Sequence, residues 1–157
     1  MDRADFVSNR LALEAVPPDA AMMVGPERIA RFIETGDVAA LAGVFADDVI
    51  IIENFAPFVF AGPRSVAHWL GGMRDHLEGT SGLEHSFGDA CDFGRASDAA
   101  FFTLPTSWQG LARGRRFREH GGWAFVLVKA DAAWRVRSYA WAVTEISAGE
   151  REDGGPS

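Results

Sequence analysis

Cysteine is almost absent from this sequence, with Cys91 the only one among 157 residues. A single cysteine excludes an intramolecular disulfide and any zinc site built from several thiolates, and it is typical of a reducing compartment. Long apolar runs are also missing, and the segment Met1–Arg10 carries charges where a signal peptide would need an apolar stretch. These absences predict a cytoplasmic protein that is neither exported nor inserted in a membrane.

Lysine is as scarce as cysteine. Lys129 is the only one, and the sequence has neither a glycine-rich phosphate loop nor a Gly-x-Ser-x-Gly motif. Walker-type phosphate binding and Schiff-base catalysis are therefore disfavoured. His68 and His76 lie eight residues apart, about 12 Å along a helix, which is too far for one metal ion. The sequence predicts no metal and no cofactor.

The formal net charge is −7, which argues against a phosphate backbone as the main partner. The one basic cluster, between Arg113 and Arg118, is surrounded by glycines and is typical of a solvated hairpin. With 48% hydrophobic and 24% charged residues, the composition is that of a single globular domain with one substantial core. We expect neither a nucleic acid nor a membrane as partner.

Three helices are predicted from apolar residues at helical spacing. The first runs from Pro26 to Gly36, the second is capped by Asp37 and ends at Asp47 and Asp48, and the third runs from Val66 to about Gly79. Residues 1–25, which precede them, are interpreted as an N-terminal arm or short helix. Residues 26–146 form the domain, and the polar, glycine-rich segment 147–157 is interpreted as a flexible tail.

Strands are predicted in the remainder. The run Val49–Ile52 favours a buried strand, and the apolar segments Leu83–Phe93, Ala99–Trp108, Arg115–Lys129 and Trp134–Ile146 follow the last helix. Consecutive strands with short connections favour antiparallel pairing. The segregation of helices and strands therefore predicts an α+β fold with a mostly antiparallel sheet, and not an alternating βαβ fold.

The element order carries a family resemblance. Gly36-Asp37-Val38, the run Phe45-Ala46-Asp47-Asp48-Val49 and Gly62-Pro63 resemble the nuclear transport factor 2-like superfamily over residues 26–146. That superfamily contains ketosteroid isomerases, SnoaL-like cyclases, scytalone dehydratase and limonene epoxide hydrolase. The resemblance implies a cone-shaped α+β barrel, in which a strongly curved sheet is closed by three helices and a ligand enters the open end. Fold alone does not assign a reaction.

Glu53 is the first candidate for catalysis. The resemblance implies this role, because ketosteroid isomerases carry a catalytic aspartate at the position that Glu53 matches. The flanking residues Ile52 and Phe55 would leave its carboxylate poorly solvated and raise its pKa toward the range of a general acid or base. The alternative is that Glu53 faces solvent at a strand end. His85 and His120 are further candidates, as acid–base partners of Glu53 or Glu119, or as surface histidines.

The resemblance to ketosteroid isomerases themselves is incomplete. Ile29 stands where that family has its oxyanion-donating tyrosine, and no acid is present near Trp123–Phe125, where the second donor would stand. Steroid isomerisation is therefore not expected. Aromatic residues on the predicted elements favour a pocket for a small hydrophobic or aromatic ligand. The residues expected to line it are Ile29, Phe58, Trp69, Trp108, Trp123 and Trp141.

Two faces are expected along the last strand. Arg135, Arg137, Tyr139 and Trp141 would share one of them, which would face solvent or a second copy of the chain, since relatives often form homodimers through the sheet. The leading hypothesis is a small-molecule-binding domain, in its catalytic form a cofactor-independent isomerase, cyclase, dehydratase or hydrolase. The alternatives are a non-catalytic ligand-binding or dimerisation module and a protein-interaction domain.

Overall fold

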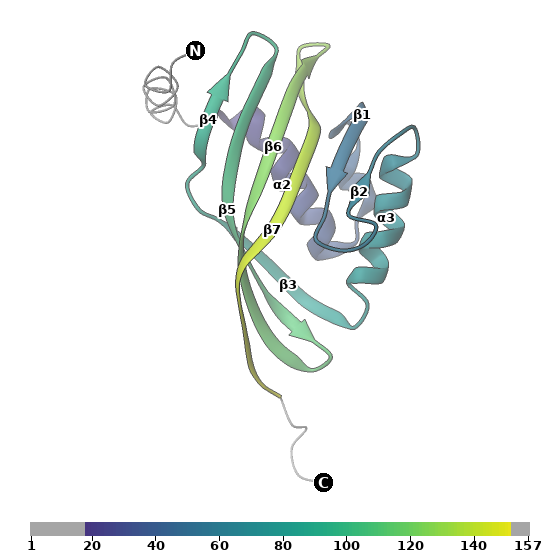
Figure 1. The fold of residues 1–157 in the computed structure, drawn as a ribbon, viewed down its shortest axis with the longest axis vertical. Coiled ribbons are helices and arrows are strands. Elements are labelled where there is room, and N and C mark those ends of the chain that lie inside the picture. The colour runs from purple at the N-terminus through teal and green to yellow at the C-terminus, as the bar shows by residue number, and fades with distance from the viewer. Residues whose placement is uncertain (1–17, 152–157) are drawn as a thin grey trace.

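The computed structural model describes residues 18–151. Its elements, in chain order, are α2 (Ala20–Thr35), the 3-10 helix η1 (Val38–Leu41), β1 (Phe45–Ile52), β2 (Val59–Phe60), α3 (Ser65–His76), β3 (Thr80–Phe87), β4 (Cys91–Arg95), β5 (Ala99–Ala112), β6 (Arg115–Ala130) and β7 (Ala133–Arg151). This order confirms the predicted α+β class (Figure 1).

All seven described strands belong to one sheet with the order β2-β1-β7-β6-β5-β3, and β4 pairs with β5. Every pairing is antiparallel except β1 with β7, which run parallel. The parallel pair joins the first strand to the last, so residues from the two ends of the domain lie side by side. Glu53, one residue after β1, is thereby brought next to the middle of β7.

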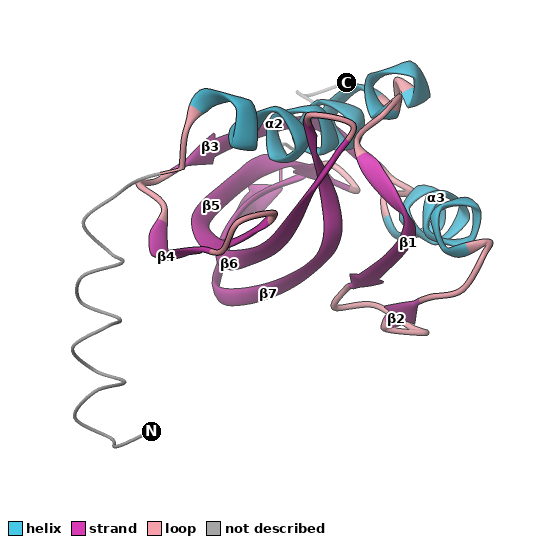
Figure 2. Ribbon diagram, turned by 90° about the horizontal axis from the view of Figure 1, so that it is seen from above, coloured by secondary structure: helices cyan, strands magenta, loops and turns pink. Residues whose placement is uncertain are grey.

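The sheet is strongly curved, and α2 lies across its concave side while α3 lies beside β1 (Figure 2). α2 packs against β7 and β3, and α3 packs against β1 and β2. None of the helices in the described residues is long and apolar enough to cross a membrane. Between them, the helices and the inner face of the sheet enclose the hydrophobic core.

The first helix begins at Ala20, six residues before the predicted start at Pro26. Asp19 is its N-cap, because its side chain accepts a hydrogen bond of 2.9 Å from the backbone N–H of Met22. Pro26 is tolerated inside the helix, and Gly25 lets the helix approach β7, since a Cβ atom there would lie 2.9 Å from Val136 Cγ2. Pro26 was predicted to lie in the first turn, although it lies inside the helix, whereas Gly36 ends the helix as predicted, with a φ of +73°.

The second predicted helix is wrong beyond its first turn. Asp37 does cap the backbone N–H of Ala39, but only the 3-10 helix η1 follows. Gly43 adopts a φ of +71°, which an L side chain rarely adopts, and the chain then enters β1 at Phe45. Of the three expected helices, the described residues contain two α-helices and this short 3-10 helix.

Most strand boundaries differ from the prediction: β1 and β3 begin earlier than expected, at Phe45 and Thr80, and β5 ends later, at Ala112. The single strand expected over Leu83–Phe93 is two strands, β3 and β4, with Gly88 between them donating its N–H to the carbonyl of Pro105 at 2.7 Å. β7 continues to Arg151, past the expected end at Ile146, because the long arm of β6 extends alongside it.

A β-bulge in β7 overturns the predicted faces of that strand. Val126 pairs with Ser138 but Leu127 pairs with Val136, so Arg137 is an extra residue in the ladder. Its guanidinium binds Asp48 instead, with Nε 3.1 Å from the carboxylate. The extra residue moves Tyr139 to the inner face, where it is 1% exposed, and separates it from the arginines.

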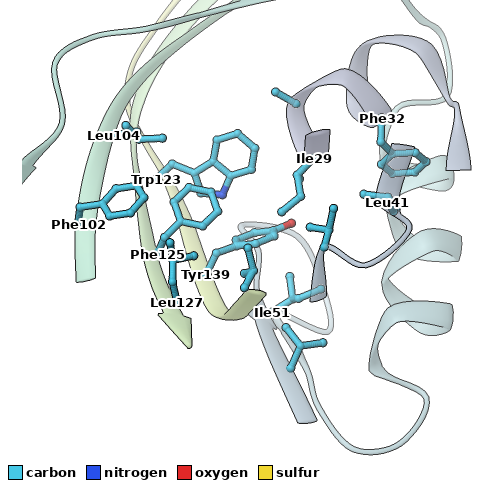
Figure 3. Packing of buried hydrophobic residues seen from close by; sticks show 14 of the residues in the cluster. Ile29, Phe32, Leu41, Ile51, Phe102, Leu104, Trp123, Phe125, Leu127 and Tyr139 are labelled. Atoms are coloured by element: carbon cyan, nitrogen blue, oxygen red, sulfur yellow. The ribbon is translucent and has the colours of Figure 1, made fainter. Parts of the chain in front are cut away.

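Aromatic rings on the inner face of the sheet form much of the core. Figure 3 shows Tyr139 lying between Ile29 of α2 and the β6 residues Trp123 and Phe125. Trp123 is in edge-on contact with Tyr139 at a centroid distance of 5.5 Å and with Trp141 at 6.0 Å. Two members of this aromatic layer, Trp123 and Trp141, also line the cavity described below, and Tyr139 contacts Glu53.

Gly121 is required by the close approach of β7. A Cβ atom at Gly121 would lie 2.2 Å from the carbonyl oxygen of Ala142 and 2.5 Å from the indole of Trp141. We expect Gly121→Ala to lower the free energy of unfolding by roughly 1–3 kcal/mol, as for other overpacked sites. Chemical denaturation measures this. The matched control is Gly122→Ala, whose new Cβ would meet only Thr103, at 3.8 Å, and an equal loss of stability in both variants would contradict the explanation.

Candidate functional site

A cavity of about 290 Å³ opens between the helices and the long arms of β5, β6 and β7. Its aromatic lining consists of Phe55, Trp108, Phe117, Trp123 and Trp141. Its aliphatic lining consists of Ile33, Met73, Leu77, Leu83, Ala112 and Ile146. Its polar lining consists of Glu53, Asn54, His76, Thr80 and Glu119. The cavity is thus apolar with a few ionisable groups, as ligand sites commonly are.

Glu53 is the most buried ionisable group of this lining, with only 5% of its surface exposed. It follows the β-branched run that ends β1 at Ile52, and its backbone N–H donates to the carbonyl of Phe58 at 2.9 Å. That bond closes the β1–β2 turn and fixes the direction of the side chain. The alternative interpretation, a carboxylate pointing to solvent, does not hold for this conformation.

One carboxylate oxygen of Glu53 receives both of its hydrogen bonds. Trp69 of α3 donates its indole N–H to Oε1 at 3.0 Å, and Tyr139 donates its hydroxyl to the same atom. Oε2 takes part in neither bond, and Glu53 lines the cavity. The two donors therefore hold the carboxyl group through one of its oxygens only.

Burial raises the pKa of Glu53 from the ordinary value of 4.5 to about 7, and the hydrogen bonds from Tyr139 and Trp69 lower it in part. A carboxyl group with this pKa exchanges its proton near neutral pH, where a general acid or base is most effective. Tyr139 remains a neutral donor, because burial and the neighbouring carboxylate raise the pKa of its hydroxyl well above 10.

Removing the tyrosine hydroxyl should raise the pKa of Glu53 above about 7. The hydroxyl donates to Glu53, and a donor stabilises the charged form of the carboxyl group. We expect a carbon-detected NMR titration of Tyr139→Phe to show the Glu53 carboxyl carbon shifting at higher pH than in the wild type. A pKa that stays unchanged or falls would show that the hydroxyl does not support the carboxylate.

Two further ionisable groups face the same cavity. Glu119 of β6 has a pKa raised by burial, and His76 at the end of α3 has a pKa lowered by burial. The His76 ring stacks on Phe55 with centroids 4.3 Å apart and planes inclined by 19°. Each of these shifts favours the uncharged form of the group, which follows from the apolar lining.

The two histidines predicted for catalysis lie outside this lining. His85 Nδ1 contacts the carboxylate of Glu34, which also accepts the backbone N–H of His85 at 2.8 Å. His120 Nδ1 lies 2.6 Å from the hydroxyl of Ser107. The expected pairing of either histidine with Glu53 or Glu119 is therefore not observed. Both had been placed on strands correctly, but sequence alone did not show which face or neighbour each would meet.

Of the six residues expected to line the pocket, three do so: Trp108, Trp123 and Trp141. Ile29 and Trp69 are fully buried beneath the site, where Trp69 instead holds Glu53. Phe58 lies on the turn after β1, has a φ of +72° and is 55% exposed.

Sequence reasoning missed His76 and the supporting roles of Tyr139 and Trp69. Tyr139 was assigned to the opposite face because period-two alternation was followed across Arg137, where the bulge lies. Trp69 was recognised as an inward-facing residue of its helix, and a buried indole N–H needs an acceptor. That requirement, with a carboxylate predicted nearby, is the signal from which the Trp69–Glu53 contact could have been inferred.

The sequence matches no protein-family model and no curated protein. Its structure does match solved structures over almost the whole chain. The hexachlorocyclohexane dehydrochlorinase LinA-type3 from Novosphingobium barchaimii has a TM-score of 0.72 at 11% identity, over 99% of this chain and 100% of that chain. A candidate scytalone dehydratase from Novosphingobium aromaticivorans has a TM-score of 0.67 at 15% identity, over 99% and 97%.

A candidate ketosteroid isomerase from Shewanella frigidimarina has a TM-score of 0.63 at 21% identity, over 79% of this chain and 96% of that chain. These likenesses define the class as α+β proteins with a curved, mostly antiparallel sheet. More particularly, the chain has the nuclear transport factor 2-like, or SnoaL-like, fold that its element order predicted.

Proposed function

We propose that this protein binds a small, largely apolar organic molecule in its cavity and transfers a proton to or from it through Glu53. The reaction classes are isomerisation, cyclisation, dehydration or hydration, and none of them needs a cofactor. The observation that carries the proposal is the arrangement of Glu53: it is buried, its Oε1 accepts from two donors, and the residue lines the cavity.

Each property serves proton transfer. A pKa of about 7 lets Glu53 act as base or acid near neutral pH. The bonds from Trp69 and Tyr139 fix the carboxyl group, so that little reorganisation is needed when the ligand reacts. The dehydrochlorinase and the candidate dehydratase and isomerase that share the fold are named for small-molecule reactions, which supports the same class for this chain.

True ketosteroid isomerase activity is not proposed. Tyr139 is the only tyrosine of the chain, and its hydroxyl donates to Glu53 itself. It is thus engaged with the base and is not a second donor placed opposite the base, where an enolate oxygen would need it. The chemistry proposed here is carried by one carboxyl group and its two supporting residues.

A flat probe with an acidic C–H bond tests the proposal without knowledge of the natural substrate. In 5-nitrobenzisoxazole, a base removes the C3 proton, the electron pair forms the nitrile and the N–O bond breaks to release a coloured phenolate. We expect wild-type protein to accelerate this ring opening, with a rate that rises with pH through about 7. Glu53→Gln should lower kcat/KM by roughly 10²-fold or more.

The control for that experiment is Glu84→Gln, which removes a carboxylate that lies outside the cavity lining and binds Gln109. Its rate should equal the wild-type rate. Equal rates for wild type and Glu53→Gln would refute the proposed role of Glu53. Binding of the probe without Glu53-dependent turnover would instead favour the alternative function, a non-catalytic ligand-binding module.

We also propose a homodimer formed through the outer face of the sheet. The residues at the centre of this face carry no charge: they are Phe101, Thr103, Pro105, Gly122, Ala124, Val126, Ser138, Ala140 and Ala142, neighbours across β5, β6 and β7. Phe101, 38% exposed, adds a large apolar ring to this uncharged surface. Sedimentation should therefore give twice the chain mass, and Ala124→Arg should reduce it to one chain. A wild-type monomer would overturn the proposal.

A further inference from the structure

We propose that the ligand of this cavity is a cation, namely a flat aromatic or polycyclic molecule carrying a protonated amine or other ammonium group. This inference rests on the proposed function, because it names the substrate class for the same cavity. It is carried by the charges and the aromatic rings of the lining, taken together with the size of the cavity.

Within residues 18–151, the cavity is lined by two acidic side chains and by no side chain that is positively charged near neutral pH. Glu53 and Glu119 face the cavity, and among the described residues no lysine or arginine does so. The third ionisable group, His76, has a pKa lowered by burial, so the imidazole is uncharged near neutral pH. Whatever charge the lining carries there is negative. An anionic ligand would meet only like charge, and a cation would restore balance.

The hydrogen bonds of the Glu53 carboxylate favour the same class of ligand. Glu53 is 5% exposed, and both donors that hold it bind Oε1, so neither of them occupies Oε2. An ammonium N–H that reached Oε2 would donate to it and would stabilise the charged carboxylate, which a neutral hydrocarbon cannot do.

The aromatic lining suits the same ligand. Trp108, Trp123 and Trp141 lie together with Phe55 and Phe117 around the cavity. The faces of tryptophan and phenylalanine rings attract organic cations, and a desolvated contact of this kind contributes more than an exposed one. With about 290 Å³, the cavity has room for a small ring system and not for a long chain.

Three probes of one shape test the charge preference: 2-naphthylmethylammonium, 2-naphthylmethanol and 2-naphthoate. Equilibrium dialysis at pH 8 gives their dissociation constants. We expect the ammonium to bind about tenfold more tightly than the alcohol, and the carboxylate to bind most weakly. Glu119→Gln should reduce the preference for the ammonium several-fold and leave the affinity for the alcohol unchanged.

A pH series on the wild type provides the same test without a variant. Lowering the pH to 5.5 protonates Glu53 and favours the protonated forms of Glu119 and His76. Each of these changes removes negative charge from the lining or adds positive charge to it, which disfavours a cation. The preference for the ammonium should shrink or vanish. An alcohol that binds as tightly as the ammonium at pH 8, or a preference that survives at pH 5.5, would overturn the inference.

The outcomes also separate this inference from the function on which it rests. If the neutral and cationic probes bind equally and Glu53 still accelerates the ring opening of the benzisoxazole, only the charge preference is wrong. If none of the three probes binds, the cavity is not a site for flat aromatic molecules, and both the inference and the proposed function fall.

Discussion

Replacing Glu53 with glutamine is expected to make the folded protein about 3 kcal/mol more stable at pH 8 while removing its capacity for proton transfer. The wild-type carboxyl group has a pKa of about 7 in place of the ordinary 4.5. Since a tenfold change in an acid constant corresponds to about 1.4 kcal/mol, keeping this group charged costs the folded state about 3 kcal/mol. Glutamine has no charge to bury and still offers Trp69 and Tyr139 an acceptor oxygen.

The direction with pH follows from proton binding. Between pH 4.5 and about 7 the folded protein holds the Glu53 proton more tightly than the unfolded chain does, so raising the pH across this window destabilises the folded state. Below pH 4.5 both states are protonated and the penalty disappears. The stability gain of Glu53→Gln should therefore be small at pH 4.5, grow through the window and level off above pH 7.

Urea unfolding of both proteins at several pH values measures this difference directly, since contributions from all other groups cancel in the comparison. Glu84→Gln is the control, because this exposed carboxylate should show no such pH-dependent gain. A Glu53→Gln variant that is less stable than the wild type at pH 8 would mean that the buried carboxylate stabilises the fold and is not held there at a cost.

A large loss of folding stability is expected when Trp69 is replaced by alanine. This indole is 0% exposed, packs against Phe32 and Phe45 with centroids 5.3 and 5.5 Å away, and donates to Glu53. Trp69→Ala leaves a large cavity and removes a donor from a buried carboxylate. We expect a loss of roughly 3–5 kcal/mol in the free energy of unfolding, the usual range for a buried tryptophan.

Trp134 at the start of β7 provides the comparison. It lies at the end of the sheet, where Arg95 and Lys129 approach its ring at 5.3 and 5.6 Å, and it is only partly buried. Trp134→Ala should cost far less than Trp69→Ala. Chemical denaturation of both variants decides the point, and equal losses would contradict the assignment of Trp69 to the centre of the core.

The fold was predictable because several weak signals agreed. Apolar spacing predicted the central residues of α2 and α3, and the β-branched run Val49–Ile52 predicted the second half of β1. The succession of elements then pointed to one fold. The prediction of the second helix was wrong because the spacing of Leu41, Val44 and Phe45 fits both a helix and a turn followed by a strand. The left-handed backbone of Gly43 ends the helical turn and so produces the second arrangement.

The site was predictable only in part. Glu53 was found because its position after a β-branched strand and before aromatic residues implies poor solvation, and it is indeed buried beside the cavity. Its partner Tyr139 could not be found by alternation, because one bulged residue, Arg137, reverses the faces of the residues that directly follow it, Tyr139 included. The histidines were placed on strands, but their neighbours depend on pairing register and on α2, which no local pattern encodes.

The arrangement has a simple physical logic. A carboxyl group that must exchange a proton near neutral pH has to be taken out of water, which destabilises the fold. Trp69 and Tyr139 offset part of that cost by donating to one oxygen, Oε1, and the proposed ligand would bind the other. Stability and the proposed activity are thus opposed at this one residue.

The most direct test of the account is the pKa of Glu53 itself, measured by carbon-detected NMR on protein labelled at the glutamate carboxyl carbons. The signal is identified by its absence from Glu53→Gln. The account predicts a titration midpoint near 7 in the free protein. A midpoint near the ordinary 4.5 would show that the carboxyl group is well solvated, and it would contradict both the buried site and the proton-transfer function built on it.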